Sequence, residues 1–205
     1  MPRHAFKFPG VVVEAVRAHV QRAIDGLDPT RYRQEPNYTA ALIGRLEGSA
    51  YKGPLGEVTF ANTVYDDRGA NSAEKLFGAD HAITATISDG KVKIHKAILV
   101  QAKLGSIESL TNAERELLRE QIIKMKNVLP APKVMEIPEY NGRRFPAMVS
   151  GNRILDGADY FPMQLADYFV ARVITTLDGC TNPNVVAAVK DSSLRQLRVY
   201  ARIEA

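Results

Sequence analysis

Residues 76–104, LFGADHAITATISDGKVKIHKAILVQAKL, constrain the fold most strongly, because they predict two strands joined by a hairpin. Residues 82–87 show the period-two alternation of a strand. Asp89-Gly90 is a strong hairpin signal, since both residues tolerate positive φ. The return segment, residues 94–104, contains a continuous apolar run, which is typical of a strand covered on both faces. The sequence therefore predicts a hairpin built into a covered sheet.

Polar residues gather at one end of this hairpin. A two-residue turn would place Asp80 opposite Leu99, with Gln101 slightly further toward the same end of the sheet, and a bulge after the turn would shift this register by a residue or two. Gln101 and Lys103 share one face, because side chains repeat every second residue. Oxygen ligands suit Mg²⁺ and a lysine can neutralise a phosphate, so this end is a candidate site for phosphodiester hydrolysis. The alternative left open is a hairpin with a merely polar end, where Lys103 is a surface lysine.

The remaining segments predict one α/β domain. Apolar residues recur at helical spacing over residues 11–27, 36–46, 111–128 and 161–177. Strand-like segments are residues 57–65, 133–137, 146–149 and 197–203, with a turn at Asn141-Gly142 and a further short segment at 185–189. The polar residues 66–75 predict a loop. Since no repeat or linker interrupts this order, we expect residues 1–205 to form a single domain.

Composition narrows the class of protein. Hydrophobic residues make up 45% and charged residues 24%, as in ordinary globular proteins. The single cysteine, Cys180, excludes an internal disulfide framework, and no apolar run approaches the roughly 20 residues of a membrane span. The N-terminus lacks a signal-peptide pattern, so a cytoplasmic protein is expected. The net charge of +4 is compatible with a polyanionic partner. Dinucleotide-binding, P-loop, hydrolase-elbow and zinc patterns do not occur in the sequence.

Two short motifs carry a resemblance to a known family. Gly78-Ala79-Asp80, followed after the hairpin by the run Leu99-Val100-Gln101-Ala102-Lys103, resembles the PD-(D/E)xK nuclease superfamily. The variant is the one with glutamine at the acidic position, as in Mrr-like restriction endonucleases. Residues 34–39 resemble the acidic first helix of that family, and residues 121–125 resemble the helix after the catalytic lysine. The similarity covers about residues 35–125 and implies a restriction-endonuclease-like three-layer fold, with a mixed central sheet flanked by helices.

The resemblance also implies a role for each matching residue. Asp80 would bind the metal, Gln101 would assist it, and the backbone carbonyl of Ala102 could be a further ligand. Lys103 would be the catalytic lysine. Glu35 would be the additional metal-binding or water-positioning acid, although a carboxylate at the start of a helix is also favoured there by the helix dipole alone.

Some alternatives stay open at this stage. Glu57, which also precedes a strand, is the alternative additional acid. The motif departs from the family pattern in having Ala79 before Asp80 and a neutral Gln101, which should weaken Mg²⁺ binding. His81 follows Asp80 in a strand and should point to the opposite face. Basic residues that could line a phosphate groove are Arg31, Arg33, Lys52, Arg143 and Arg144.

The expected activity is therefore Mg²⁺-dependent endonucleolytic cleavage of DNA, with Mn²⁺ as a possible substitute metal. Double-stranded DNA is the expected substrate, and a homodimer or higher oligomer would allow both strands to be cut. The rival hypotheses are a non-catalytic nucleic-acid-binding or assembly subunit of the same fold, and a nuclease acting on RNA. The sequence does not distinguish a role in restriction or phage defence from one in repair.

Overall fold

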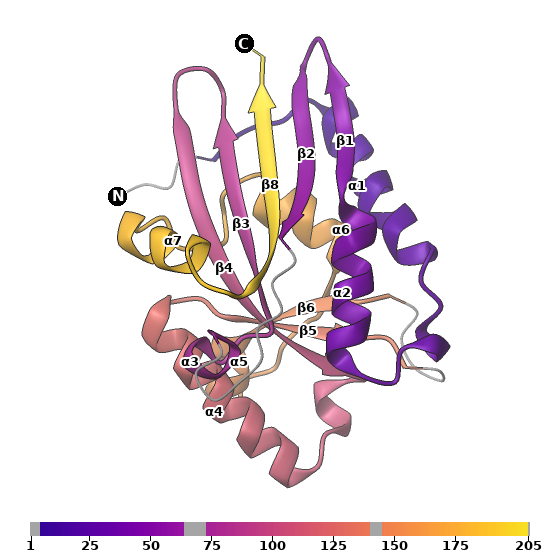
Figure 1. Ribbon diagram of the computed structural model, residues 1–205, viewed down its shortest axis with the longest axis vertical. Helices are drawn as coiled ribbons and strands as arrows, with labels where there is room; N and C mark the ends of the chain where they lie inside the picture. The colour runs from indigo at the N-terminus through magenta and orange to yellow at the C-terminus, as the bar shows by residue number, and fades with distance from the viewer. Residues whose placement is uncertain (1–4, 64–72, 140–144, 205) are drawn as a thin grey trace.

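The computed structural model describes residues 5–63, 73–139 and 145–204. Within these ranges the strands form one eight-stranded mixed sheet in the order β1-β2-β8-β3-β4-β5-β6-β7 (Figure 1). The pairs β3–β8 and β4–β5 are parallel and the other neighbours are antiparallel. The strands are β1 Gly48–Gly53, β2 Gly56–Thr63, β3 His81–Ser88, β4 Lys93–Leu104, β5 Lys133–Ile137, β6 Ala147–Ser150, β7 Met163–Gln164 and β8 Arg195–Ile203.

Helices cover both faces of the sheet, and each face has its own hydrophobic core. The first face carries α1 Gly10–Asp25, η1 Pro29–Arg31, α2 Glu35–Leu46, α6 Leu165–Tyr168 and the π-helical turn η3 Phe169–Val173. The second face carries α3 Ala73–Phe77, η2 Ile107–Ser109, α4 Asn112–Val128, α5 Gly151–Leu155 and α7 Pro183–Lys190. The predicted α/β class, with a mixed sheet flanked by helices, is confirmed. None of the helices in the described ranges has the length and apolarity that a bilayer crossing requires.

The central hairpin forms as predicted, but its register differs by two residues. His81 pairs with Val100 and Ser88 with Lys93, so the connection is a four-residue loop rather than a two-residue turn. The cause is the side chain of Asp89, whose Oδ1 accepts hydrogen bonds from the backbone N–H groups of Lys91 and Val92. These bonds hold the longer loop, and the shifted register brings Asp80 opposite Gln101 instead of Leu99.

β4 carries the middle of the fold, as its apolar run predicts. Its residues from Lys96 to Ala102 are buried, with β3 on one side and β5 on the other. α4 follows it and returns the chain to β5, which is parallel to β4. Thr111 caps α4 through a reciprocal capping box with Glu114.

The sequence-based prediction missed or misassigned several elements. Residues 48–53, for which the sequence analysis predicted no element, form β1, and the first residues of α3 lie in the described part of the predicted loop 66–75. The predicted helix 161–177 is shorter, because Met163–Gln164 pairs with β6 and the chain turns at Thr176, which has φ 66°. The short segment 185–189 belongs to a helix, α7, and α5 was not predicted. Residues 64–65 and the turn Asn141-Gly142 lie outside the described residues.

Candidate active site

The candidate site lies along the part of β4 that extends beyond the start of β3. The N–H of Asp80 donates to the carbonyl oxygen of Val100 at 3.0 Å, and no residue of β3 pairs with β4 past this point. The next two N–H groups on this edge instead meet carboxylates. Ala102 N donates to Oδ2 of Asp80 at 2.7 Å, and Leu104 N donates to Oε1 of Glu35 at 2.9 Å. Two acidic side chains therefore replace the missing strand partner.

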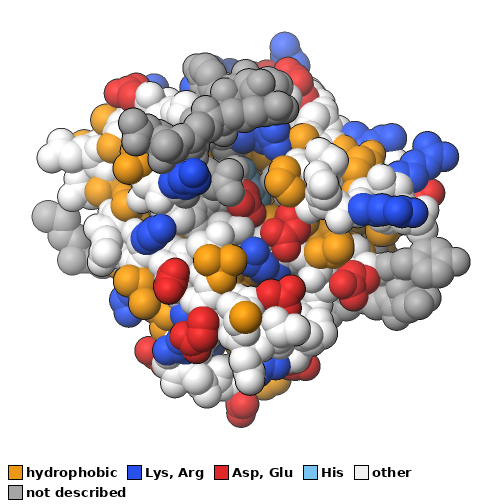
Figure 2. Space-filling view, turned by 60° about the horizontal axis from the view of Figure 1, so that its bottom comes forward, with side chains coloured by type: hydrophobic (Ala, Val, Ile, Leu, Met, Phe, Trp, Pro, Cys, Tyr) orange, Lys and Arg blue, Asp and Glu red, His pale blue; other side chains and the backbone are white. Residues whose placement is uncertain are grey.

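The spacing of β4 determines how these two carboxylates lie relative to each other. Alternate residues of a strand direct their backbone groups to the same side, at about 3.3 Å per residue, so the two donors are about 7 Å apart. The carbonyl of Ala102 points to the same edge as its N–H. The carbonyl oxygen of Ala102 therefore lies on this edge between the carboxylates of Asp80 and Glu35. Figure 2, which turns the lower end of Figure 1 forward, shows acidic and basic side chains gathered together on this end of the molecule.

Gln101 lies directly against Asp80. Its side-chain nitrogen donates to Oδ2 of Asp80 at 2.7 Å and, more weakly, to the carbonyl of Ala102 at 3.3 Å. The residue is 1% exposed, and its amide oxygen is buried without a hydrogen-bond partner. An unsatisfied buried acceptor costs about 1–3 kcal/mol, so an additional donor or cation at this oxygen would be stabilising.

Lys103 and Glu35 form an ion pair, with 3.3 Å between Nζ and Oε2. Their side chains are 12% and 28% exposed, so the pair is partly shielded and still reachable from solvent. Glu35 is the first residue of α2 and is followed by Pro36, while Tyr38 and Leu42 anchor the helix in the core. The buried stripe of α2 thus holds the carboxylate of Glu35 against the end of β4.

The two candidates for the additional acid lie at opposite ends of the sheet. Glu57 pairs with Arg202 of β8, whereas His81, next to Asp80, pairs with Arg195 of the same strand. At about 3.3 Å per residue, the distance along β8 between these two positions is roughly 23 Å. The structure therefore brings Glu35, and not Glu57, to Asp80, Gln101 and Lys103.

Glu136 is a residue of this region that sequence reasoning missed. It is the Cα partner of Lys103 on the neighbouring strand β5 and is 3% exposed. Its Oε1 accepts hydrogen bonds from the N–H of Ile107 at 2.9 Å and from the hydroxyl of Ser106 at 3.4 Å. The available signal was an acidic residue within the short apolar run KVMEI, where a charge needs a partner.

His81 is buried under α2, beside Thr39 and Leu42, while Asp80 is bonded to the edge of β4. Burial, and secondarily the charge of Arg195, lowers the pKa of His81 to about 3. The imidazole is therefore neutral at physiological pH.

Of the basic residues suggested by the sequence, Lys52 pairs with Glu57 at the distant end of the sheet. Arg31 forms an ion pair with Asp28, and Arg33 lies two residues before Glu35 in the chain. Arg143 and Arg144 lie outside the described residues.

A metal ion at this end of β4 would meet oxygen atoms of several chemical types. Within residues 5–63, 73–139 and 145–204, no three side chains of His, Cys, Asp or Glu lie together as a metal-binding group. Two carboxylates, those of Asp80 and Glu35, lie at this strand end, and the third oxygen-bearing side chain there is the neutral amide of Gln101. The possible ligands are the carboxylates of Asp80 and Glu35, the amide oxygen of Gln101 and the carbonyl of Ala102.

Comparison with protein-family models, with curated proteins and with solved structures finds no match to this chain.

Proposed function

We propose that the protein is a Mg²⁺-dependent endonuclease of the restriction-endonuclease-like type, which hydrolyses phosphodiester bonds in double-stranded DNA. The observation that carries this proposal is the edge of β4, where the carboxylates of Asp80 and Glu35 accept successive backbone N–H groups. Lys103 lies at the same edge through its ion pair with Glu35. Carboxylates, an amide oxygen and a lysine at one strand end are the groups that phosphodiester hydrolysis requires.

The orphaned oxygen of Gln101 supports a cation at this position. Mg²⁺ prefers oxygen ligands, and the carboxylate of Asp80 and the carbonyl of Ala102 both contact the amide nitrogen of Gln101. A half-turn of this amide would place its unpartnered oxygen beside them and so complete a set of three oxygen ligands. When bound, the cation would lower the pKa of a coordinated water and offset negative charge on the phosphate. The neutral Gln101 supplies one negative charge fewer than a carboxylate, so the site should bind Mg²⁺ weakly without substrate.

The chain's own residues would act on the phosphate and the attacking water. The ammonium of Lys103, held by Glu35, can move to a phosphate oxygen and neutralise its developing charge. This movement would release Oε2 of Glu35, which could then accept a proton from the water that attacks phosphorus. Leu104 N would keep the carboxylate in place through its bond to Oε1.

The order of elements along the chain also supports the proposal. α2 supplies Glu35, the hairpin β3–β4 supplies the other three residues, and α4 then leads to the parallel strand β5.

A non-catalytic nucleic-acid-binding subunit of the same fold is the second candidate. It is favoured by the contacts that already engage both acids, since Asp80 accepts from Gln101 and Glu35 from Lys103. In this alternative the four side chains stabilise the end of the sheet through the ion pair and the hydrogen bonds alone, and no metal takes part.

Cleavage assays separate the two candidates. The purified protein would be incubated with duplex DNA, single-stranded DNA and RNA in Mg²⁺ or Mn²⁺, beside Asp80→Ala and Lys103→Ala. Glu57→Gln is the matched control, because it removes a carboxylate at the distant end of the sheet. We expect DNA cleavage by the wild type and Glu57→Gln, and its loss in the other two variants. Equal cleavage by all four proteins would assign the activity to a contaminant, and salt-sensitive DNA binding without cleavage would favour the binding subunit.

A further inference from the structure

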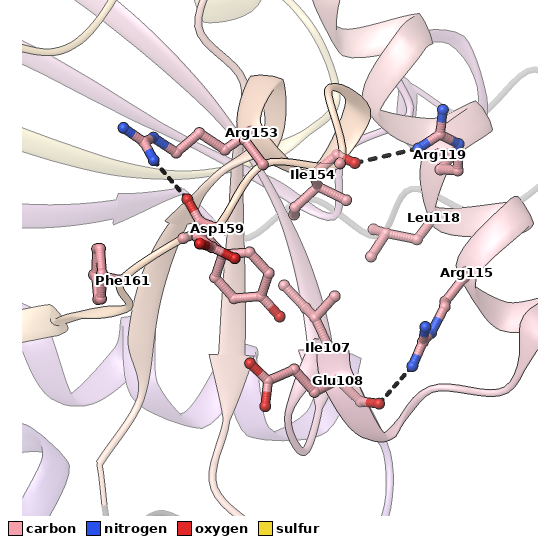
Figure 3. A pocket seen from close by; sticks show the side chains of 12 residues that line it. Ile107, Glu108, Arg115, Leu118, Arg119, Arg153, Ile154, Asp159 and Phe161 are labelled. Atoms are coloured by element: carbon pink, nitrogen blue, oxygen red, sulfur yellow. Dashed lines mark hydrogen bonds between the residues drawn. The ribbon is translucent and has the colours of Figure 1, made fainter.

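A groove of about 570 Å³ runs between α4 and the segment that follows β6 (Figure 3). Its apolar part includes Ile107, Leu118 and Ile154, which come from three different elements. At one end the ring of Phe161 is 88% exposed, an unusual position for a phenyl group. The groove thus offers a hydrophobic surface next to a free aromatic ring.

Three arginines line the same groove, namely Arg115, Arg119 and Arg153. Each donates to backbone carbonyl oxygens, and Arg119 crosses from α4 to the carbonyls of Ile154 and Leu155 at 3.2 Å. Among the described residues no carboxylate forms an ion pair with any of the three. A guanidinium has five N–H donors, so each is positioned by the backbone while retaining charge and donors for an anion.

The groove also contains hydrogen-bond acceptors. The carboxylates of Glu108 and Asp159 belong to its lining (Figure 3). Carboxylates accept hydrogen bonds from the exocyclic amino groups of bases, as they do when proteins contact cytosine. Aromatic rings stack on bases, and arginines bind phosphates. The lining therefore offers a partner for the flat face of a base, for the amino group on its edge and for the phosphate of a nucleotide.

The groove adjoins the candidate active site through Ile107. This residue lines the groove, and its N–H donates to Glu136, the strand partner of Lys103. Ile107 is four positions after Lys103 in the chain, so their Cα atoms are at most about 14 Å apart. At 3.4 Å per nucleotide along a stacked strand, this limit corresponds to at most roughly four nucleotides.

We infer that this groove binds an unpaired nucleotide of a DNA strand, and that a phosphodiester of the same strand, at most about four nucleotides away, lies at the edge of β4. The inference rests on the proposed nuclease function and specifies its substrate as DNA with a single-stranded stretch beside the cut. The ring of Phe161 stacks on the base, and the arginines bind the flanking phosphates. The volume falls within the range of about 300–1,000 Å³ usual for small-molecule sites.

Binding of labelled oligonucleotides in EDTA tests the groove independently of cleavage. Fluorescence anisotropy would compare a single strand, a blunt duplex and a duplex with an unpaired end. We expect Phe161→Ala to weaken binding of the single strand and the unpaired end about tenfold, and to leave the blunt duplex within about twofold. Arg153→Gln should reduce the salt dependence of single-strand binding by about 0.7 in the logarithmic slope. The exposed α4 residues Ile123 and Lys126 provide the controls Ile123→Ala and Lys126→Gln, which should behave as wild type.

Several outcomes would overturn the inference. Wild-type affinity of Phe161→Ala for the single strand would do so, as would an equal loss on blunt duplex. Displacement of the strand by an equal concentration of a free mononucleotide would identify a nucleotide site rather than a strand site. The substituted ring is exposed, so circular dichroism should show an unchanged fold. Selective loss of single-strand binding in a protein that cuts no DNA with Mg²⁺ or Mn²⁺ would support the groove and refute the nuclease.

Discussion

Gln101 donates a hydrogen bond of 2.7 Å to Asp80, so a neutral, almost fully buried side chain is bonded directly to the acid. The same oxygen of Asp80 accepts the N–H of Ala102 at 2.7 Å. A carboxylate at position 101 could not donate this bond and would place two negative charges in contact. The identity of residue 101 therefore affects the stability of this end of the sheet, and in the proposed metal site it would also set how strongly a cation is held.

Gln101→Glu should destabilise the metal-free protein and strengthen its response to Mg²⁺. Loss of the donor beside a buried carboxylate costs about 2 kcal/mol, or about 4–8 °C in melting temperature for a chain of this size. A cation between two carboxylates should restore much of this loss. Thermal melts with EDTA and with Mg²⁺ measure both effects, and the exposed Gln164→Glu is the matched control. Identical melting of Gln101→Glu in the two buffers would argue against a cation at this site.

Glu35→Gln should raise the Mg²⁺ concentration needed for cleavage. The substitution keeps an oxygen that can accept the N–H of Leu104 but removes the charge that pairs with Lys103. We expect at least tenfold lower cleavage at limiting Mg²⁺, with partial recovery at high Mg²⁺, because the remaining ligands still hold the cation. Initial rates across a Mg²⁺ titration would show this. An equal loss at every Mg²⁺ concentration would indicate that Glu35 serves the reaction without contributing to metal binding.

Stability should fall below neutral pH because of His81. Burial lowers its pKa to about 3 in the folded protein, against an ordinary value of 6.5, so only the unfolded chain takes up a proton between these values. Above pH 6.5 the imidazole is neutral in both states and does not reduce the stability. As the pH falls from 6.5 toward 3, protonation of the unfolded chain lowers the free energy of unfolding by up to about 1.4 kcal/mol per pH unit. Urea unfolding of the wild type and His81→Leu across this range measures the slope. A slope unchanged in His81→Leu would contradict the assignment.

The capping box of α4 predicts a second, separate pH effect. Hydrogen bonds from the side chain and the backbone N–H of Thr111 hold the pKa of Glu114 below its ordinary value. The stabilisation from this pair is therefore present above the ordinary pKa of 4.5 and is lost as the pH falls through the lower folded-state value. Thr111→Ala should cost about 1 kcal/mol at neutral pH through the lost cap, and less at pH values below that transition. Urea unfolding at neutral pH and at a pH below the Glu114 transition tests this. An equal destabilisation by Thr111→Ala at both pH values would show that the charged form of Glu114 does not contribute.

Much of the secondary structure followed from local patterns in the sequence. The helical spacing over residues 11–27, 36–46 and 111–128 and the strand signals of the hairpin correspond to α1, α2, α4, β3 and β4. These elements depend on interactions between near neighbours, which the sequence displays directly. The same reasoning fails for β1 and α3, where weak apolar periodicity is overridden by pairing and packing with distant segments.

The candidate site likewise contains features that follow from local patterns and features that depend on distant contacts. Strand periodicity and the turn were enough to predict that Asp80, Gln101 and Lys103 share one end of a hairpin, because they limit where those residues can lie. The register of the hairpin, which depends on the side chain of Asp89, and the position of Glu35 rather than Glu57 beside these residues became visible only in the folded protein. The tertiary structure also placed Glu136 beside Lys103 and inserted the last strand, β8, between β2 and β3. These features depend on contacts between residues that are far apart in the chain, and such contacts form only when the two cores pack against the sheet.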